Sequence, residues 1–360
     1  MINVTRTYLP SFEDYCKMIK PLWETRWLTN RGTFALELER KLKEKLELNH
    51  LLYVNNGMMA LQIAMKALGI KGDVITTPFS YVATTGAILW EGCNPVFVDI
   101  EDQTYCIDAD KIEAAITPET TAIIATHVFG FPCNIEKIQA IAEKNQLKVI
   151  YDGAHAFNTF YNGKSIFSYG DISICSFHAT KLFHTVEGGA IICNNKELEE
   201  KVLLYHQFGH LYDDYKEMGV NAKVSELHAA MGLCVFPLID EIIEKRKAVF
   251  ELYKHELKGL NLKFPTPSSF EGYNYAYFPV VFDSKETVLK IKQSLQENEI
   301  FSRRYFYPSL NKLPYLKENQ LCPVSETIAE RVLCLPFYPE LSEKEVGLIT
   351  RIVKNGVVKS

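Results

Sequence analysis

Residues 173–192 read SICSFHATKLFHTVEGGAII and decide the fold class. An apolar run leads into a polar turn around Lys181, and the pair Gly188–Gly189 then opens a second apolar run. Short apolar runs bounded by turn residues are typical of buried strands. The sequence therefore predicts that Lys181 lies on a loop between two buried strands.

Lys181 has two interpretations. On the local pattern alone, a solvated lysine in a turn is favoured. Enclosure by strands and aromatic residues would instead remove water from the amine, lower its pKa and make it a nucleophile. The upstream residues 148–156, KVIYDGAHA, favour the second interpretation because they form a short apolar strand that ends at Asp152. Strand-end carboxylates of α/β sheets face the ligand crevice.

An aspartate near a reactive lysine suits pyridoxal 5'-phosphate, whose ring nitrogen needs a carboxylate partner. With this pair, the chain resembles the sugar-nucleotide aminotransferases of the DegT/DnrJ/StrS family, within the aspartate aminotransferase fold group. The most specific motif is Ser-Phe-His-x-x-Lys at 176–181 with Glu-Gly-Gly at 187–189. The resemblance extends from residues 27–32 to residues 331–336.

The expected architecture is α/β with two domains. A chain of 360 residues exceeds the usual size of a single core. Strands alternate with helical segments between residues 51 and 206, which indicates a largely parallel sheet covered on both faces. The resemblance implies the type I fold of pyridoxal phosphate enzymes. In it, a large cofactor-binding domain (1–240) has a mostly parallel mixed sheet between helices, and a smaller α+β domain (241–360) follows.

Composition excludes several classes of protein. The formal net charge of −5 provides no basic surface for nucleic acid. No run reaches the roughly 18 apolar residues that span a bilayer, and the first residues do not resemble a signal peptide, so a cytoplasmic protein is expected. Nine cysteines without Cys-x-x-Cys pairs indicate reduced thiols, not a zinc site. His206 and His210 could share a metal, but Gly209 interrupts the helical pattern, and no metal is expected.

A candidate phosphate site follows the strand at residues 51–54. Asn55-Asn56-Gly57 turns this strand into the apolar helix 58–68, and a helix N-terminus binds anions through its free amides. Ordinary strand-to-helix turns look the same. The family resemblance assigns the cofactor phosphate to Gly57 and the next residue, which is usually threonine. Met58 stands there, so one hydroxyl donor is missing.

The resemblance implies roles for the remaining site residues. Lys181 carries the cofactor and moves the proton, and Asp152 pairs with the ring nitrogen. Tyr81 stacks on the ring, with core packing as its alternative, and His155 helps to fix the ring plane. Ser176 and, from the partner subunit, Asn221 complete the phosphate site. Asn221 is assigned to the partner's site because Gly219-x-Asn221 resembles a family signature that acts across a homodimer. Lys223 replaces the arginine that commonly follows.

The expected substrates are L-glutamate and a nucleotide-linked keto sugar. Residues 303–310 combine basic and aromatic groups suited to diphosphate and sugar, although a solvated turn would look alike. The residues expected to bind substrate are Thr29, His184, Arg304 and Tyr307. The Ser-Phe-His-x-x-Lys motif resembles members that aminate C4, whereas C3-acting relatives more often have Tyr-Pro-Gly-Lys. This implies dTDP-4-keto-6-deoxy-D-glucose as substrate and a role in glycan or O-antigen biosynthesis.

Other activities stay open. A C3-acting or UDP-sugar aminotransferase of the same family is the main alternative. In a dehydratase branch, a histidine replaces the lysine, so Lys181 argues against that branch. A regulatory role without catalysis is opposed by the presence of both Asp152 and Lys181.

Overall fold

A seven-stranded sheet forms the centre of the computed structural model, which describes residues 1–266, 272–316 and 320–358. The strand order is β1-β9-β8-β5-β4-β2-β3. Neighbours are parallel except where β9 pairs with β1 and β8, which confirms a mostly parallel mixed sheet. The strands are β1 (Leu51–Val54), β2 (Asp73–Thr76), β3 (Asn94–Phe97), β4 (Thr120–Thr126), β5 (Lys148–Asp152), β8 (Ile172–Ser176) and β9 (Gly189–Cys193).

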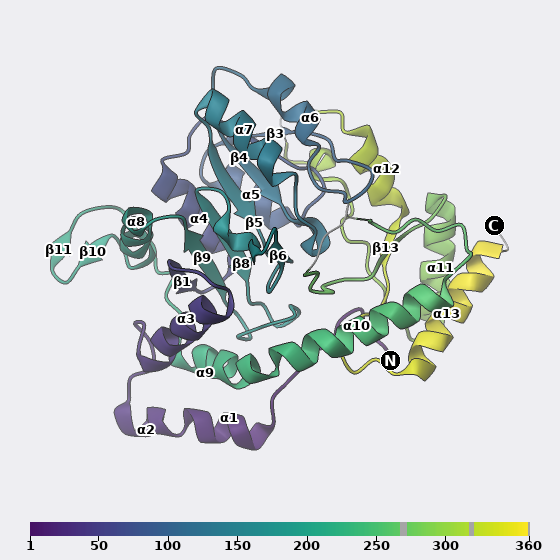
Figure 1. Cartoon of the computed structure of the whole chain (residues 1–360), viewed down its shortest axis with the longest axis horizontal. Helices are drawn as coiled ribbons and strands as arrows, with labels where there is room; N and C mark the ends of the chain where they lie inside the picture. The colour runs from purple at the N-terminus through teal and green to yellow at the C-terminus, as the bar shows by residue number, and fades with distance from the viewer. Residues whose placement is uncertain (267–271, 317–319, 359–360) are drawn as a thin grey trace.

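Helices cover both faces of this sheet (Figure 1). One face packs against α4 (Gly57–Leu68), α5 (Val82–Trp90) and α8 (Lys196–His206), and the other against α3 (Thr33–Lys45), α7 (Ile135–Asn145) and α9 (Glu226–Val235). Successive strand residues alternate between the two faces; Leu52 and Val54 join the first core, whereas Leu51 and Tyr53 join the second. This two-sided burial explains why the central residues of the strands are largely apolar.

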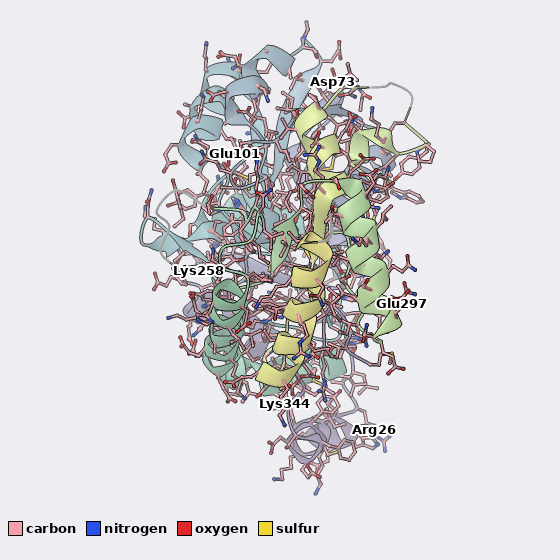
Figure 2. The ribbon with its side chains drawn as sticks, turned by 90° about the vertical axis from the view of Figure 1, so that its right-hand side faces the viewer. Arg26, Asp73, Glu101, Lys258, Glu297 and Lys344 are labelled. Carbon is pink, nitrogen blue, oxygen red and sulfur yellow. The ribbon has the colours of Figure 1, made fainter. Side chains whose placement is uncertain are left out.

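The C-terminal part has its own core. It contains α10 (Ile239–Glu256), β12 (Pro279–Val281), α11 (Lys285–Glu297), α12 (Pro323–Arg331), β13 (Val332–Cys334) and α13 (Glu343–Val358). The strands β12 and β13 form an antiparallel pair, and α11 and α13 lie side by side (Figure 2). Ile2 joins this part through backbone bonds to Glu299 and Phe301. The predicted boundary at residue 240 falls within the first turn of α10, and that division stays a prediction.

Short elements complete the chain. Near the N-terminus, Pro21 begins a new helix, so α1 (Phe12–Ile19) and α2 (Pro21–Thr25) are separate. No helix in the described ranges is long and apolar enough to cross a membrane. The remaining elements are α6 (Ala109–Ile112), β6 (Phe160–Tyr161), β7 (Lys164–Ser165), β10 (His210–Leu211), β11 (Asp214–Tyr215), η1 (Glu113–Ala115), η2 (Val128–Gly130), η3 (Ile166–Ser168), η4 (Phe236–Leu238) and η5 (Leu310–Lys312).

Candidate active site

Lys181 lies in the loop that joins β8 to β9, as the sequence predicts. No helix intervenes, so the chain returns as a wide hairpin, which makes β9 antiparallel. Backbone bonds tie the two limbs together: the amide of Phe177 donates to the carbonyl of Gly188 (2.8 Å), and that of Ala179 to Val186 (2.7 Å). The loop is therefore held by the sheet that it leaves.

The amine of Lys181 is removed from water. Its Nζ donates to the Tyr277 hydroxyl at 3.4 Å. Burial lowers the pKa of Lys181, and the negative charge of Asp152 opposes part of that shift. A lowered pKa increases the fraction of neutral amine near pH 7, which is the form that acts as nucleophile and base.

Asp152 is buried at the end of β5, and a chain of hydroxyl groups orients its carboxylate. Thr84 donates to Oδ2 at 2.7 Å, and the amide of Ala154 donates to Oδ1 at 3.1 Å. Behind Thr84, Thr126 donates to Ser80 (3.1 Å), and Ser80 lies 3.0 Å from Thr84. Burial raises the pKa of Asp152, although these bonds and Lys181 oppose the shift. A buried carboxylate of this kind is stabilised by a cationic partner.

His155 is neutral and fixed in orientation. The amide of Phe129 donates to its Nδ1 at 3.2 Å, so the ring proton is on Nε2. Burial and the nearby Lys181 hold the pKa of His155 well below its usual value. The imidazole stacks on Phe306 with the ring centres 5.5 Å apart and the planes 2° apart. This aromatic pair forms a flat wall.

The start of α4 provides an anion site. Asn56 caps the helix by accepting from the amide of Met59 at 2.8 Å, and the first amides of a helix have no acceptor within it. The end of β8 packs closely here, since a Cβ on Gly57 would lie 3.2 Å from the Cβ of Ser176. The amides of Gly57 and Met58 and the hydroxyl of Ser176 therefore form one donor set that suits a phosphate group.

A cavity of about 580 Å³ contains these groups. Tyr81 also lines it and is 52% exposed, so this ring does not belong to the core. The cavity brings together seven residues that the sequence analysis assigns to the cofactor: Gly57, Met58, Tyr81, Asp152, His155, Ser176 and Lys181.

The other predicted residues do not line this cavity. Thr29 lies in an exposed bend, and Asn221 is exposed beside Gln207, with which it forms a β-bridge. The ring of His184 is buried and hydrogen-bonded to the backbone, and its substrate-binding role stays a prediction. Its Nε2 donates to the carbonyl of Tyr8 (2.8 Å), and its Nδ1 accepts from the amide of Val186 (3.3 Å).

Arg304 and Tyr307 also lie outside this cavity, and their roles in substrate binding stay predictions. The guanidinium of Arg304 lies 3.4 Å from the Tyr307 ring centre and is directed at the carbonyls of Ala329 and Glu330. The adjacent Arg303 lines the cavity instead. Successive residues of an extended segment point in opposite directions, so only one of two adjacent arginines was to be expected at the site.

Sequence reasoning missed further residues of the site. Thr84, which binds Asp152, lies on a helix whose pattern predicts only apolar packing. Tyr277, Tyr305 and Phe306 come from the C-terminal part of the chain, and their placement depends on how that part packs against the sheet. For Thr84 and Tyr277 the chain offers no local signal, whereas Tyr305 and Phe306 lie within residues 303–310, the stretch whose basic and aromatic groups suit diphosphate and sugar.

The predicted absence of a metal concerns His206 and His210. His206 is buried, which lowers its pKa to about 3, while Nδ1 of His210 lies 2.8 Å from the carbonyl of Tyr212. Within the described ranges, no group of three or more His, Cys, Asp or Glu residues could hold a metal ion. All nine cysteines are free thiols.

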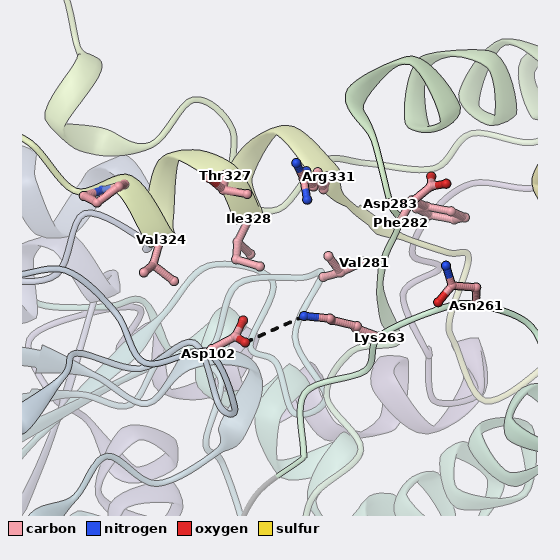
Figure 3. A pocket seen from close by; sticks show the side chains of 11 residues that line it. Asp102, Asn261, Lys263, Val281, Phe282, Asp283, Val324, Thr327, Ile328 and Arg331 are labelled. Atoms are coloured by element: carbon pink, nitrogen blue, oxygen red, sulfur yellow. Dashed lines mark ion pairs between the residues drawn. The ribbon is translucent and has the colours of Figure 1, made fainter. Parts of the chain in front are cut away.

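A second cavity of about 610 Å³ lies beside β12 and α12 (Figure 3). Val281, Val324 and Ile328 form apolar parts of its wall, and Lys263 lies 3.7 Å from Asp102 across it. Both charged side chains are largely exposed, whereas Asp152 is buried and burial lowers the pKa of Lys181. The first cavity is therefore the candidate active site.

The donor set of the first cavity fits pyridoxal phosphate at both ends. A buried carboxylate lies at one end, a helix N-terminus with a serine at the other, and a lysine of lowered pKa lines the space with them. The sheet and this site together define an enzyme of the pyridoxal phosphate-dependent aminotransferase class.

Comparison with known proteins identifies the family. The model of the DegT/DnrJ/EryC1/StrS aminotransferase family matches residues 12–354, and the chain belongs to this family of pyridoxal phosphate-dependent sugar-nucleotide aminotransferases. It is 40% identical to the dTDP-4-amino-4,6-dideoxy-D-glucose transaminase of Shigella dysenteriae over 98% of both chains. It is 30% identical to the GDP-perosamine synthase of Vibrio cholerae, covering 97% of this chain and 98% of that protein.

A solved structure shows the same fold. The crystal structure of DesI in the presence of its TDP-sugar product matches with a TM-score of 0.93 and 28% identity, over 99% of this chain and 93% of that one. The predicted fold, enzyme class and cofactor are thus confirmed, and the substrate is a nucleotide sugar.

Proposed function

We propose that this enzyme transfers the amino group of L-glutamate to C4 of dTDP-4-keto-6-deoxy-D-glucose. The product would be dTDP-4-amino-4,6-dideoxy-D-glucose, for use in glycan or O-antigen biosynthesis. The observation that carries the proposal is the 40% identity, over 98% of both chains, to a transaminase named for this product. The Ser-Phe-His-x-x-Lys turn supports C4 over C3.

Lys181 acts as base and acid in this reaction. Pyridoxal phosphate, when bound, supplies an electron sink and holds the amino group between the two half-reactions. The Nζ of Lys181 would remove the proton from Cα of the donor, and the resulting ammonium group would then donate a proton to complete the amino transfer. Its lowered pKa keeps the amine neutral enough for the first step, and the Tyr277 hydroxyl holds it in place.

The other residues of the site would bind and orient the cofactor. Asp152 would pair with the protonated ring nitrogen, and the hydroxyl chain through Thr84 keeps its carboxylate aimed at that atom. His155 and Tyr81 would enclose the ring between them. The amides of Gly57 and Met58, with Ser176, would hold the phosphate.

We also propose a homodimer with shared active sites. Asn221 is exposed in the protomer and bridges Gln207, three residues before the pair β10–β11, which projects from the rest of the molecule in Figure 1. Exposed apolar side chains surround it, including Phe208 (48% exposed) and Val220 (41%). A partner subunit would cover them, and Asn221 would then reach the phosphate in the partner's cavity.

The test is incubation of the enzyme with L-glutamate and a panel of dTDP-, UDP- and GDP-linked keto sugars, with the products identified by NMR. Amination at C4 of the dTDP sugar is expected. Preferred turnover of a 3-keto sugar or of a UDP sugar would replace the proposal with the main alternative. If no keto sugar reacts although glutamate changes the cofactor spectrum, the proposed acceptor is wrong and the donor is right.

A further inference from the structure

Arg246, on α10, is a buried cation that does not line the active-site cavity. It is 3% exposed, and burial lowers the pKa of Arg246 to about 10, so the guanidinium stays charged near pH 7. In the described part of the chain Arg246 forms no ion pair, whereas Arg31 pairs with Glu39 at 2.6 Å. Buried charges are ordinarily paired, because the loss of hydration is costly. The groups that Arg246 does contact must therefore explain its place.

Both of these hydrogen-bond partners are backbone carbonyls. The Nη1 atom of Arg246 donates to the carbonyl of Tyr275 at 3.1 Å and to the carbonyl of Ala276 at 3.1 Å. The guanidinium also lies over the ring of Phe337, 5.1 Å from its centre. The Nε atom has no hydrogen-bond partner among the described residues. The cation is thus directed at two successive peptides of one segment.

That segment, residues 272–278, has no regular secondary structure. Buried backbone groups outside helices and sheets must find other partners. Asn274 provides some of them, since its side-chain nitrogen donates to the carbonyls of His155 (2.8 Å) and Phe157 (2.9 Å). Its side-chain oxygen accepts from the amide of Ala276 (3.1 Å). Asn274 therefore ties the segment to the wall of the cavity, and Arg246 ties it to α10.

Tyr275 is the strained point of the segment. Its φ is +52°, in the left-handed region, which is unfavourable for a residue with a side chain. Such a conformation persists where surrounding contacts hold it. The bonds from Arg246 to the carbonyl of Tyr275 and to the next carbonyl hold this turn. Without them Tyr275 could relax, and the residues that follow it would move.

Tyr277 follows this turn by two residues and reaches the reactive amine. Its hydroxyl accepts from Nζ of Lys181 at 3.4 Å. Its ring meets the ring of His155 edge on, with the centres 4.8 Å apart. A distance of 3.4 Å is near the upper limit for a hydrogen bond, so a small displacement of Tyr277 is enough to break it.

We propose that Arg246 is a positioning residue of the active site, which holds the turn at Tyr275 and so places the Tyr277 hydroxyl against the amine of Lys181. The proposal rests on the proposed function only insofar as Lys181 is the reactive amine. Arg246 acts from outside the cavity and touches neither substrate nor cofactor.

Positioning and simple charge have opposite effects on Lys181. Because Nζ donates to the Tyr277 oxygen, the bond stabilises the ammonium form, and its loss lowers the pKa of Lys181. The charge of Arg246 acts in the other direction, since a nearby cation disfavours the ammonium form. If Arg246 positions Tyr277, removing Arg246 lowers the pKa of Lys181; if only its charge matters, removing it raises that pKa.

The first experiment measures the pKa of Lys181 in the cofactor-free enzyme, by competitive labelling with acetic anhydride across a range of pH and mass spectrometry of the labelled peptide. The variants are Arg246→Lys, which keeps the charge on a side chain one atom shorter, Arg246→Gln, Tyr277→Phe, and the double variant of Arg246→Lys with Tyr277→Phe. The other titratable groups that act on the amine are the same in every variant: Asp152, Tyr81, His155, Cys175 and Tyr305.

The second experiment follows the donor half-reaction of the loaded enzyme by cofactor absorbance, with L-glutamate and with L-glutamate deuterated at Cα. Tyr253→Phe is the matched control, because Tyr253 lies on the same helix and its buried hydroxyl donates to the carbonyl of Pro336 (2.9 Å), outside the segment 272–278. Thermal unfolding shows that each variant is folded.

Both Arg246 variants should lower the pKa of Lys181, in the same direction as Tyr277→Phe. Proton removal should slow roughly 2- to 10-fold, the factor expected for one hydrogen bond, and the isotope effect should increase. The double variant should be no slower than Tyr277→Phe alone, because Arg246 acts through Tyr277. Tyr253→Phe should lower thermal stability yet leave the pKa of Lys181 and the isotope effect unchanged.

An unchanged pKa of Lys181 and an unchanged donor rate in a folded Arg246→Lys enzyme would overturn the proposal. A pKa that rises in Arg246→Gln but stays constant in Arg246→Lys would also overturn it, since charge alone would then act. Additive slowing in the double variant, or the same changes in Tyr253→Phe, would contradict a route through Tyr277. If Arg246→Gln does not fold, Arg246→Lys decides. If the wild type does not react with L-glutamate, the proposed donor is wrong, while the labelling still tests Arg246.

Discussion

The hydroxyl of Thr84 should set the acidic limit of activity through Asp152. Thr84→Val keeps the shape of the side chain but removes the 2.7 Å hydrogen bond to the Asp152 carboxylate. Both residues are buried, so water cannot readily replace the lost donor. A hydrogen bond to a charged group contributes about 1.5–3 kcal/mol, and the ionised carboxylate loses that stabilisation.

The direction in which the acidic limit moves follows from the ionisation of Asp152. Burial already raises its pKa, and the bond from Thr84 acts in the opposite direction. Without that bond the pKa rises further, so the carboxylate becomes protonated at a higher pH. The ring nitrogen then loses its partner, and activity is lost as the pH falls through the new pKa. The acidic limb of the pH profile of kcat/KM should therefore move to higher pH, while the basic limb stays in place.

The adjacent Thr85 provides the matched control. Thr85 is equally buried, and no hydrogen-bond partner of its Oγ1 lies within the described residues. Thr85→Val should therefore leave the pH profile unchanged and the free energy of unfolding equal or higher. The assay is steady-state kinetics from acid to neutral pH for both variants and the wild type. Coincident acidic limbs for Thr84→Val and Thr85→Val would refute the role assigned to the hydroxyl chain.

Three further predictions concern the phosphate end of the site, the subunit interface and the buried His184. Met58→Thr restores a hydroxyl at the start of α4 and should tighten cofactor binding by up to about 1.5–3 kcal/mol without changing sugar preference, as measured by cofactor titration; equal or weaker affinity would show that the phosphate is already saturated. Mixing inactive Lys181→Ala chains with impaired Asn221→Ala chains should restore part of the activity in heterodimers, and no recovery after proven subunit exchange would contradict shared sites. His184→Ala should lower thermal stability, since the carbonyl of Tyr8 loses its donor, while the KM for the sugar stays within about twofold; a large selective rise in that KM would instead support a role of His184 in substrate binding.

Much of the large sheet was predictable because its strands are short apolar runs between glycine turns and amphipathic helices. The loop that carries Lys181 and the strand end at Asp152 were predictable for the same reason. The antiparallel direction of β9 could also be predicted, since the chain between β8 and β9 has no helix to make a parallel crossover.

The substrate side of the site was not predictable in the same way. The local sequence does not distinguish Arg303 from Arg304. The β-bridge between Arg303 and Cys334 decides which of the two side chains faces the cavity. His184 lies three residues from Lys181, yet its ring turns toward the carbonyl of Tyr8, a contact between segments 176 residues apart. Contacts of this range depend on tertiary packing, which periodicity and motif spacing do not encode.

The attachment of the cofactor to Lys181 tests the account most directly. Borohydride reduction of the loaded enzyme, followed by proteolysis and mass spectrometry, should place a pyridoxyl group on Lys181. Lys181→Ala should fold, show no labelled peptide and have no turnover. A label on Lys164 or Lys223 in the wild type, or turnover by the Lys181→Ala enzyme, would contradict the assignment of this cavity as the active site.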